Sequence, residues 1–209
     1  MQSPYSLYNL HRNPFGELTR VERAELAVVE ELEAWVVALA DKRTAIQFVG
    51  DCGFGKTTHL LAIERRFANV AYIYYPETGP RPVLPNERPV LVDEADRMGW
   101  RQHMRLLLGG GPIAIGTHVD YSWRLQRAGF QVMNVNVERY KQPSLLAKIL
   151  NRRIEASRLV AELPIPQIDD GFAEQLLYRF DSNLRRIEHF LYERFQLSIS
   201  ERTSWPPAI

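Results

Sequence analysis

Apolar positions along the first two thirds of the chain form short runs separated by helical patterns. The runs AIQFVG (45–50), VAYIYY (70–75), PVLVDEAD (89–96), PIAIGT (112–117) and FQVMNV (130–135) predict buried strands. Between them, residues 56–67, 97–108 and 121–127 have the spacing of helices. Strands that alternate with helices predict an α/β fold with a parallel sheet that is covered on both faces.

Two segments beside these runs have distinct patterns. Residues 20–40 place apolar side chains at a spacing close to 3.6, which predicts one amphipathic helix. Residues 76–89, PETGPRPVLPNERP, contain five prolines and cannot form an ordinary helix. We therefore expect an extended crossing between two parallel strands, which leaves one face of the sheet thinly covered as a surface for a partner.

The pattern after Tyr140 is helical throughout. Residues 143–160, 170–180 and 183–197 each predict a helix, and ELPIPQ (162–167) is the main break. We expect an N-terminal segment that packs on the core (1–44), an α/β core (45–138), a small all-helical part (139–197) and a tail (198–209).

Composition narrows the classes of function. The 209 residues have a formal charge of +1, so any nucleic-acid contact must be local. One cysteine excludes an internal disulfide framework and is typical of a reducing compartment. We find no apolar stretch of about 20 residues and no signal-peptide pattern at the N-terminus, so we expect a cytoplasmic protein that does not span a membrane.

The stretch GDCGFGKTT between the first strand and the next helix matches G-x-x-x-x-G-K-[ST], the pattern of a phosphate-binding loop. Lys56 is expected to reach the β- and γ-phosphates of ATP, and the Thr57 hydroxyl is expected to bind Mg²⁺. The alternative is a glycine-rich turn, but the flanking strand and helix favour the loop. The expected nucleotide contacts are Gly50, Asp51, Cys52, Gly53, Phe54, Gly55, Lys56, Thr57 and Thr58. Oxidation of Cys52 could block the loop, although a filler role is the simpler interpretation.

Two carboxylates end the strand VLVDEAD. Parallel sheets bind ligands at the carboxyl ends of their strands, so Asp93 is expected to hold Mg²⁺ and Glu94 to polarise the attacking water. A solvated strand end is the alternative for an isolated Asp-Glu pair. A P-loop kinase would also use an acid at this position.

The order GDCGFGKT, VLVDEAD, AIGT and then SNLRRIE resembles that of the AAA+ ATPases. It is closest in style to the initiator, clamp-loader and transposition-regulator branch, and the likeness runs from NPF (13–15) to Gln196. The resemblance implies a P-loop NTPase core with a small C-terminal helical lid, ATP with Mg²⁺ between them, and self-association.

The resemblance also implies roles for four further residues. Thr117 occupies the place of the γ-phosphate sensor, where asparagine is usual and His118 is a competitor. Arg127 is similar in placement to an arginine finger that acts on a neighbouring subunit, with Arg124 as the runner-up.

The other two residues lie outside the core pattern. Arg185 matches the lid arginine, and Phe15 of NPF either contacts the adenine or belongs to the core.

Arg97, Arg101 and Arg105 recur every four residues, which predicts a basic stripe on one helix. Such a stripe is either a contact for duplex DNA or an ordinary solvated face. We therefore expect an ATP-hydrolysing switch that assembles and regulates a DNA-associated client. The alternatives are a nucleotide-gated scaffold or chaperone-like protein without DNA contact and, less favoured, a P-loop phosphotransferase.

Overall fold

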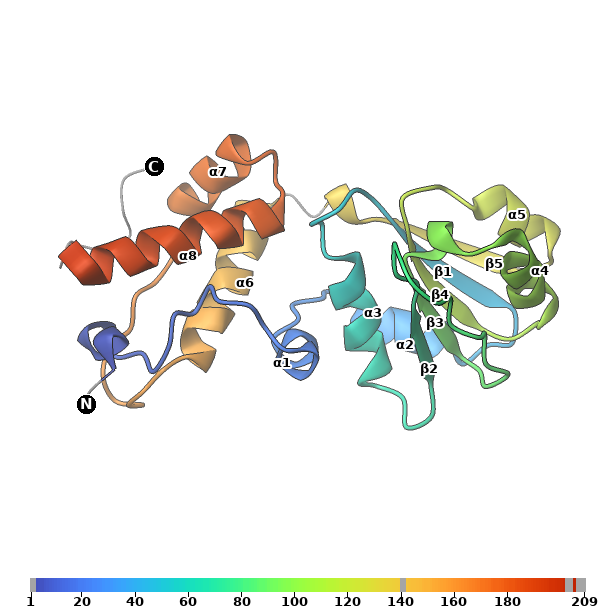
Figure 1. Ribbon diagram of the computed structural model, residues 1–209, viewed down its shortest axis with the longest axis horizontal. Helices are drawn as coiled ribbons and strands as arrows, with labels where there is room; N and C mark the ends of the chain where they lie inside the picture. Colours follow the sequence, from blue (N-terminus) through green and yellow to red (C-terminus); the bar gives the residue numbers. More distant parts are fainter. Residues whose placement is uncertain (1–2, 140–141, 202–204, 206–209) are drawn as a thin grey trace. The chain divides into compact units, whose positions relative to one another are not determined.

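The computed structural model describes residues 3–139, 142–201 and 205, and its chain forms two compact units (Figure 1). One unit is Val29–Arg139, and the other combines Met1–Val28 with Tyr140–Ile209. We call them the α/β unit and the helical unit.

The α/β unit contains a five-stranded parallel sheet. Its strands are β1 (Thr44–Val49), β2 (Ala71–Tyr74), β3 (Val90–Asp93), β4 (Ile113–Thr117) and β5 (Gln131–Asn136). Their order in the sheet is β2-β3-β4-β1-β5, and every neighbouring pair is parallel. The predicted parallel α/β fold is therefore confirmed. Since β1 lies between β4 and β5, its carboxyl end is the topological switch point at which such sheets bind ligands.

Helices cover both faces of the sheet, as Figure 1 shows. On one face, α2 (Leu32–Ala38) and α3 (Lys56–Glu64) bring Trp35 and His59 against Phe48, with ring centroids 4.9 Å and 5.1 Å from that of Phe48. On the other face, α4 (Trp100–Leu108) and α5 (Ser122–Arg127) bury Leu106 and Leu125 in a cluster with strand residues. Strand β1 contributes buried side chains to both faces of the sheet, because successive side chains of a strand point to opposite sides.

The connection from β2 to β3 contains no helix, as its prolines predict. Its Leu84 side chain is 2% exposed and lies in the same cluster as Leu106. The extended chain therefore covers part of the face that we expected to be thinly covered.

The prediction of one helix over 20–40 was wrong. The structure has α1 (Arg20–Glu25) and α2, with irregular chain between them. The Arg152 guanidinium donates to the carbonyls of Glu25, at 2.8 Å, and Ala27, at 3.3 Å. These bonds satisfy the carbonyls that continuing helix would use, so α1 ends there.

The helical unit contains α6 (Pro143–Ala156), α7 (Asp170–Arg179), α8 (Leu184–Glu201) and a 3₁₀ turn, η1 (Pro4–Tyr8). We expected residues 1–44 to pack on the α/β core. Residues 3–28 instead belong to the helical unit, because Leu10 and Phe15 are buried in its core with Leu150 and Phe195. No helix within the described residues is long and apolar enough to cross a membrane.

Arg153 of α6 holds the N-terminal segment in this unit. Its side chain is 4% exposed, and its Nε donates to the Pro14 carbonyl at 3.0 Å. The other guanidinium nitrogens bond to the Gly16 carbonyl and the Glu188 carboxylate. One buried cation therefore satisfies acceptors on two segments that are far apart in sequence.

Replacing Arg153 should destabilise the helical unit. Arg153→Met leaves the Glu188 carboxylate and two carbonyls without their donor, so we expect a loss of about 3 kcal/mol in the free energy of unfolding. Chemical denaturation of the full chain measures this loss. Lys148→Met, at an exposed position of the same helix, is the matched control and should change stability by less than about 0.5 kcal/mol. Equal stability of the two variants would contradict this role of Arg153.

The pH dependence of stability should contain a contribution from His59 of α3. Its Nδ1 lies 2.8 Å from the Gly55 carbonyl, its ring packs on Trp35 and Phe48, and burial lowers its pKa. Below its normal pKa of about 6.5, the unfolded chain takes up the proton more readily than the folded chain. We therefore expect stability to fall between pH 7 and pH 5, and to fall less in His59→Asn, which keeps a donor for Gly55 but does not titrate. Denaturation midpoints across this range provide the measurement, and an unchanged slope in the variant would contradict the assignment.

Candidate functional site

A glycine loop, residues 50–55, connects β1 to α3. Gly53 and Gly55 have φ values of 92° and 90°, in the left-handed region that favours glycine. At Gly50, a Cβ atom would lie 2.6 Å from Val137 Cγ2, which is too close for a side chain to fit. The loop ends at Gly55, the N-cap of α3, so backbone N–H groups and the positive end of the helix dipole lie together. This geometry suits a phosphate group.

Lys56 opens α3 and turns back into the glycine loop. Its ammonium donates to the carbonyls of Gly50, at 2.7 Å, and Asp51, at 3.1 Å, and the residue is 4% exposed. A cation held within the loop can neutralise phosphate charge there.

The Asp93 carboxylate is buried at the end of β3, next to the loop. Its Oδ2 accepts hydrogen bonds from Thr57 Oγ1 at 2.7 Å and from the Tyr72 hydroxyl at 2.8 Å. Its Oδ1 accepts from the Glu94 backbone N–H at 3.2 Å. Thr57 and Asp93 bring hydroxyl and carboxylate oxygens together, and such hard oxygen ligands fit Mg²⁺. Sequence analysis missed Tyr72, because only the pairing of β2 with β3 brings it to Asp93.

Glu94 has a left-handed backbone, with φ 57° and ψ 49°. Its carboxylate, 13% exposed, lies 3.4 Å from His118 Nε2 and 3.5 Å from the Arg97 guanidinium. A non-glycine residue in this conformation is strained, and the strain persists only where surrounding contacts hold it. The contacts with His118 and Arg97 supply that restraint and orient the carboxylate.

The two candidates for the γ-phosphate sensor differ in their surroundings. Thr117 is fully buried, and its hydroxyl donates to the Val119 carbonyl and accepts from the Val119 N–H. His118, by contrast, places Nε2 3.3 Å from Lys56 Nζ. Its backbone N–H donates to Asp96 Oδ1 at 3.1 Å. The His118 side chain therefore lies beside the glycine loop, whereas the Thr117 hydroxyl is bonded within the turn that follows β4.

Glu94, Asp96 and His118 also offer ligand atoms within 4.8 Å of one another, close enough for a metal ion. However, the Lys56 ammonium and the Arg97 guanidinium already lie against His118 and Glu94, respectively. These two cations lower the affinity of the group for a metal ion. The exposed Cys52 thiol lies 3.8 Å from His118 Nε2, on the open side of the same group.

Gln47 anchors the segment that follows His118, and sequence analysis missed it as well. It is fully buried on β1, and its amide donates to Asp120 at 2.7 Å and to the Ser122 hydroxyl at 2.6 Å. Its oxygen accepts from the Tyr121 N–H at 2.9 Å. Hydrogen bonds from Ser122, followed by Gln47 and Asn134, lower the pKa of Asp120. The sequence signal for this role was the position of Gln47, a polar residue within the apolar run AIQFVG.

The two candidate arginine fingers are exposed on α5. The Arg124 guanidinium lies 5.5 Å from the Tyr121 ring, and that of Arg127 lies 5.6 Å from the Trp123 ring. Both residues are exposed and accessible to another molecule.

The predicted stripe of three arginines on one helix was wrong. Arg97 lies in a 3₁₀ turn, η2 (Ala95–Arg97), and extended Met98 separates it from α4. Its guanidinium contacts Glu94 and the carbonyl of Tyr75. Only Arg101 and Arg105 are on α4, because the extended backbone of Met98 and Gly99 interrupts the helix before Trp100.

Two predicted nucleotide contacts belong to the helical unit. Phe15 is 3% exposed, and its ring packs on Phe195 and Trp205, which favours a core role over contact with adenine. Arg185 is exposed in the first turn of α8, next to Arg186, whose guanidinium is 4.0 Å from Asp181.

Comparison with known proteins gives relatives by structure only. No protein-family model and no curated protein matches the sequence. The chain is similar to the RuvB Holliday junction branch migration motor of Thermotoga maritima, with 18% identity and a TM-score of 0.52 over 85% of this chain and 65% of that chain. Two point variants of the same RuvB give 18% identity and TM-scores of 0.52 and 0.51, covering 90% and 97% of this chain and 65% and 66% of theirs. The chain thus spans about two thirds of the length of these structures.

The sheet order, the helices on both faces and the likeness to RuvB agree with one another. The fold of this chain is therefore similar to that of RuvB.

Proposed function

We propose that this protein is an ATP-hydrolysing, Mg²⁺-dependent molecular switch. One observation carries the proposal: the glycine loop with Lys56, the Thr57–Asp93 pair and the Glu94–His118 pair all converge at the carboxyl edge of the sheet. This combination provides an anion cradle, oxygen ligands for a hard cation and a carboxylate base.

Each of these residues has a proposed task in hydrolysis. Lys56 and the N–H groups of the glycine loop bind the phosphates of ATP, and Glu94 accepts a proton from the attacking water. Mg²⁺, held by Thr57 and Asp93, supplies charge neutralisation at the phosphate oxygens when it is bound. We assign contact with the γ-phosphate to His118, because its imidazole lies beside both Lys56 and Glu94 whereas the Thr117 hydroxyl is engaged with Val119.

We further propose that the active site is shared between copies of the chain. Arg127 is exposed on α5 and is our candidate for the arginine that stabilises the γ-phosphate on a neighbouring protomer, with Arg124 as the alternative. In the same protomer, Arg185 is the proposed lid arginine.

The proposed client is DNA-associated. The name of the structural relative describes a motor at Holliday junctions, and Arg101 and Arg105 are exposed on α4. ATP-dependent, salt-sensitive binding to duplex DNA that weakens in the Arg101→Ala, Arg105→Ala double variant supports this client. Indifference to DNA favours the scaffold without DNA contact.

Lys56→Ala and Glu94→Gln should separate binding from chemistry. Lys56→Ala removes the ammonium group that is proposed to bind the phosphates, so calorimetry should show no tight ATP binding. Glu94→Gln keeps the cradle but lacks the base, so it should bind ATP normally and hydrolyse it at least about 10²-fold more slowly. Tight binding by the first variant, or a near-normal rate in the second, would contradict the assignments.

Mixing two inactive variants tests the shared site. Arg127→Ala retains its own loop and base, and Glu94→Gln retains Arg127, so a mixture should recover ATP turnover that neither variant has alone. An arginine finger contributes about 10³-fold or more to the rate, so recovery is measurable against this background. Specific activity of the unmodified protein should also rise with protein concentration. Failure to recover activity, with activity independent of concentration, would remove Arg127 from this role.

A further inference from the structure

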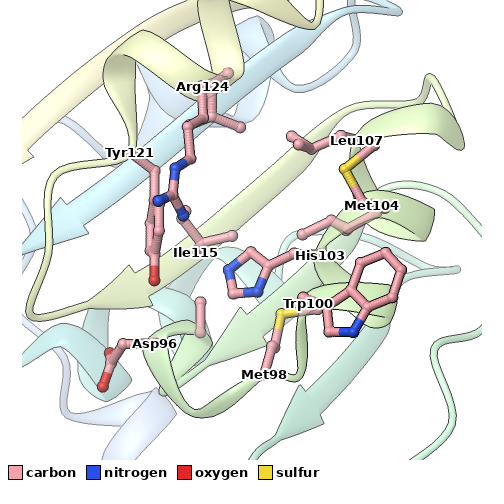
Figure 2. A pocket seen from close by; sticks show the side chains of 12 residues that line it. Asp96, Met98, Trp100, His103, Met104, Leu107, Ile115, Tyr121 and Arg124 are labelled. Atoms are coloured by element: carbon pink, nitrogen blue, oxygen red, sulfur yellow. The ribbon is translucent and has the colours of Figure 1, made fainter.

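A groove lies between α4 and α5, away from the glycine loop, and Figure 2 shows its lining. Its volume is about 430 Å³, and its walls are largely apolar, with Met98, Met104, Leu107 and Ile115 among them. The size is within the range of about 300–1,000 Å³ that is typical of binding pockets. Methionine side chains adapt to varied partners, so two of them in one groove suit a docking surface.

The same two helices also expose large apolar side chains, of which Trp100 borders the groove. Trp100, at its rim, is 72% exposed, Leu108 at the end of α4 is 78% exposed, and Trp123 on α5 is 68% exposed. Trp100 thus adds exposed apolar surface at the rim, which a partner bound in the groove would cover.

His103 adds a polar requirement inside the groove. Its Nε2 is buried and has no hydrogen-bond partner among the described residues, and its ring lies between Trp100 and Arg124 in Figure 2. Burial lowers the pKa of His103, with hydrogen bonds to the Met98 and Gly99 carbonyls acting in the opposite direction. The unpartnered nitrogen thus calls for a donor, which an occupant of the groove can supply.

Arginines outnumber acidic side chains on the two helices beside the groove, and Asp96 is the acidic residue among the described residues of its lining. Helices α4 and α5 contain no Asp or Glu and four arginines, Arg101, Arg105, Arg124 and Arg127. Arg124 lines the groove directly, and the Arg101 guanidinium lies 5.6 Å from the Trp100 ring at the rim. An apolar centre with a basic rim is complementary to an apolar segment flanked by acidic side chains.

We propose that the groove between α4 and α5 docks a segment of a partner protein in which an apolar face is flanked by Asp or Glu. The apolar side chains fill the space along Met98, Met104 and Leu107, and the carboxylates pair with Arg124 and Arg101. DNA fits the hollow less well, because among the described residues Arg124 is the one cationic side chain in a lining that is otherwise largely apolar and includes the Asp96 carboxylate. The inference is independent of the proposed ATPase activity.

Methionine NMR provides a direct test on the full chain. The sequence has four methionines, of which Met98 and Met104 line the groove, whereas Met133 pairs with Ile46 and so shares the opposite face of the sheet. The probe is a peptide of about 16 residues, roughly four helical turns, with Leu at i, i+3 and i+4 spacing and Glu elsewhere. The matched probe has Lys in place of every Glu.

The expected result is a saturable shift of the Met98 and Met104 methyl signals with the Glu peptide and no shift at Met133. Arg124→Glu should weaken binding of the Glu peptide about tenfold and strengthen binding of the Lys peptide. Lys42→Glu carries the same change of charge at an exposed position before β1 and is the control, with binding unchanged.

Three outcomes would overturn the proposal. Equal binding of both peptides would mean that charge does not select the occupant. Shifts of Met98 and Met104 with single-stranded or duplex DNA, and none with the Glu peptide, would assign the groove to nucleic acid. Shifts that follow protein concentration alone, and that Met104→Glu abolishes, would assign it to a second copy of the chain.

Discussion

The buried Asp93 carboxylate is the constraint on which the geometry of the candidate site depends. An isolated carboxylate inside a sheet is costly, so its oxygens need donors. Thr57 from α3, Tyr72 from β2 and the Glu94 N–H supply them. These bonds tie the helix after the glycine loop to two strands, and they fix the point at which Glu94 leaves the sheet. The position of Glu94, the proposed base, thus follows from the hydrogen bonds that the neighbouring Asp93 carboxylate needs.

The segment after β4 has a corresponding pair of anchors. Gln47 holds Tyr121 and its neighbours from inside the sheet, and Asp96 accepts from the His118 backbone. Between these anchors, His118 lies next to Lys56. Asp96 also lines the groove between α4 and α5, so one carboxylate belongs to both surfaces of the α/β unit. Buried polar groups with complete hydrogen bonding specify one arrangement more strongly than apolar packing does.

The helical unit is organised around its own core rather than around the sheet. Leu10 and Phe15 complete a core that the C-terminal helices build, and Arg153 links the two segments by hydrogen bonds. The two ends of the chain therefore form one unit, and the α/β unit is inserted between them. A local pattern in residues 1–28 cannot reveal this, because the contacts join positions more than 100 residues apart.

The sequence by itself determined the features that depend on neighbouring residues. Short apolar runs and turn residues set the five strands and their order along the chain, and the spacing of Gly50, Gly55 and Lys56 set the loop after the first strand. The sequence also predicted that Asp93 and Glu94 lie at the edge of the sheet where ligands bind, because the carboxyl ends of parallel strands all lie at that edge.

Tertiary structure decided the features that depend on contacts between distant segments. Strand pairing brought Tyr72 to Asp93, and the turn after β4 buried Thr117 and presented His118. Two helices replace the one predicted over 20–40, because the chain leaves the helical unit and enters the α/β unit between Val28 and Val29. Arg97 does not belong to the predicted stripe because extended Met98 and Gly99 separate it from α4. Periodicity reports which side of an element is buried, but only the folded chain decides which residues meet there.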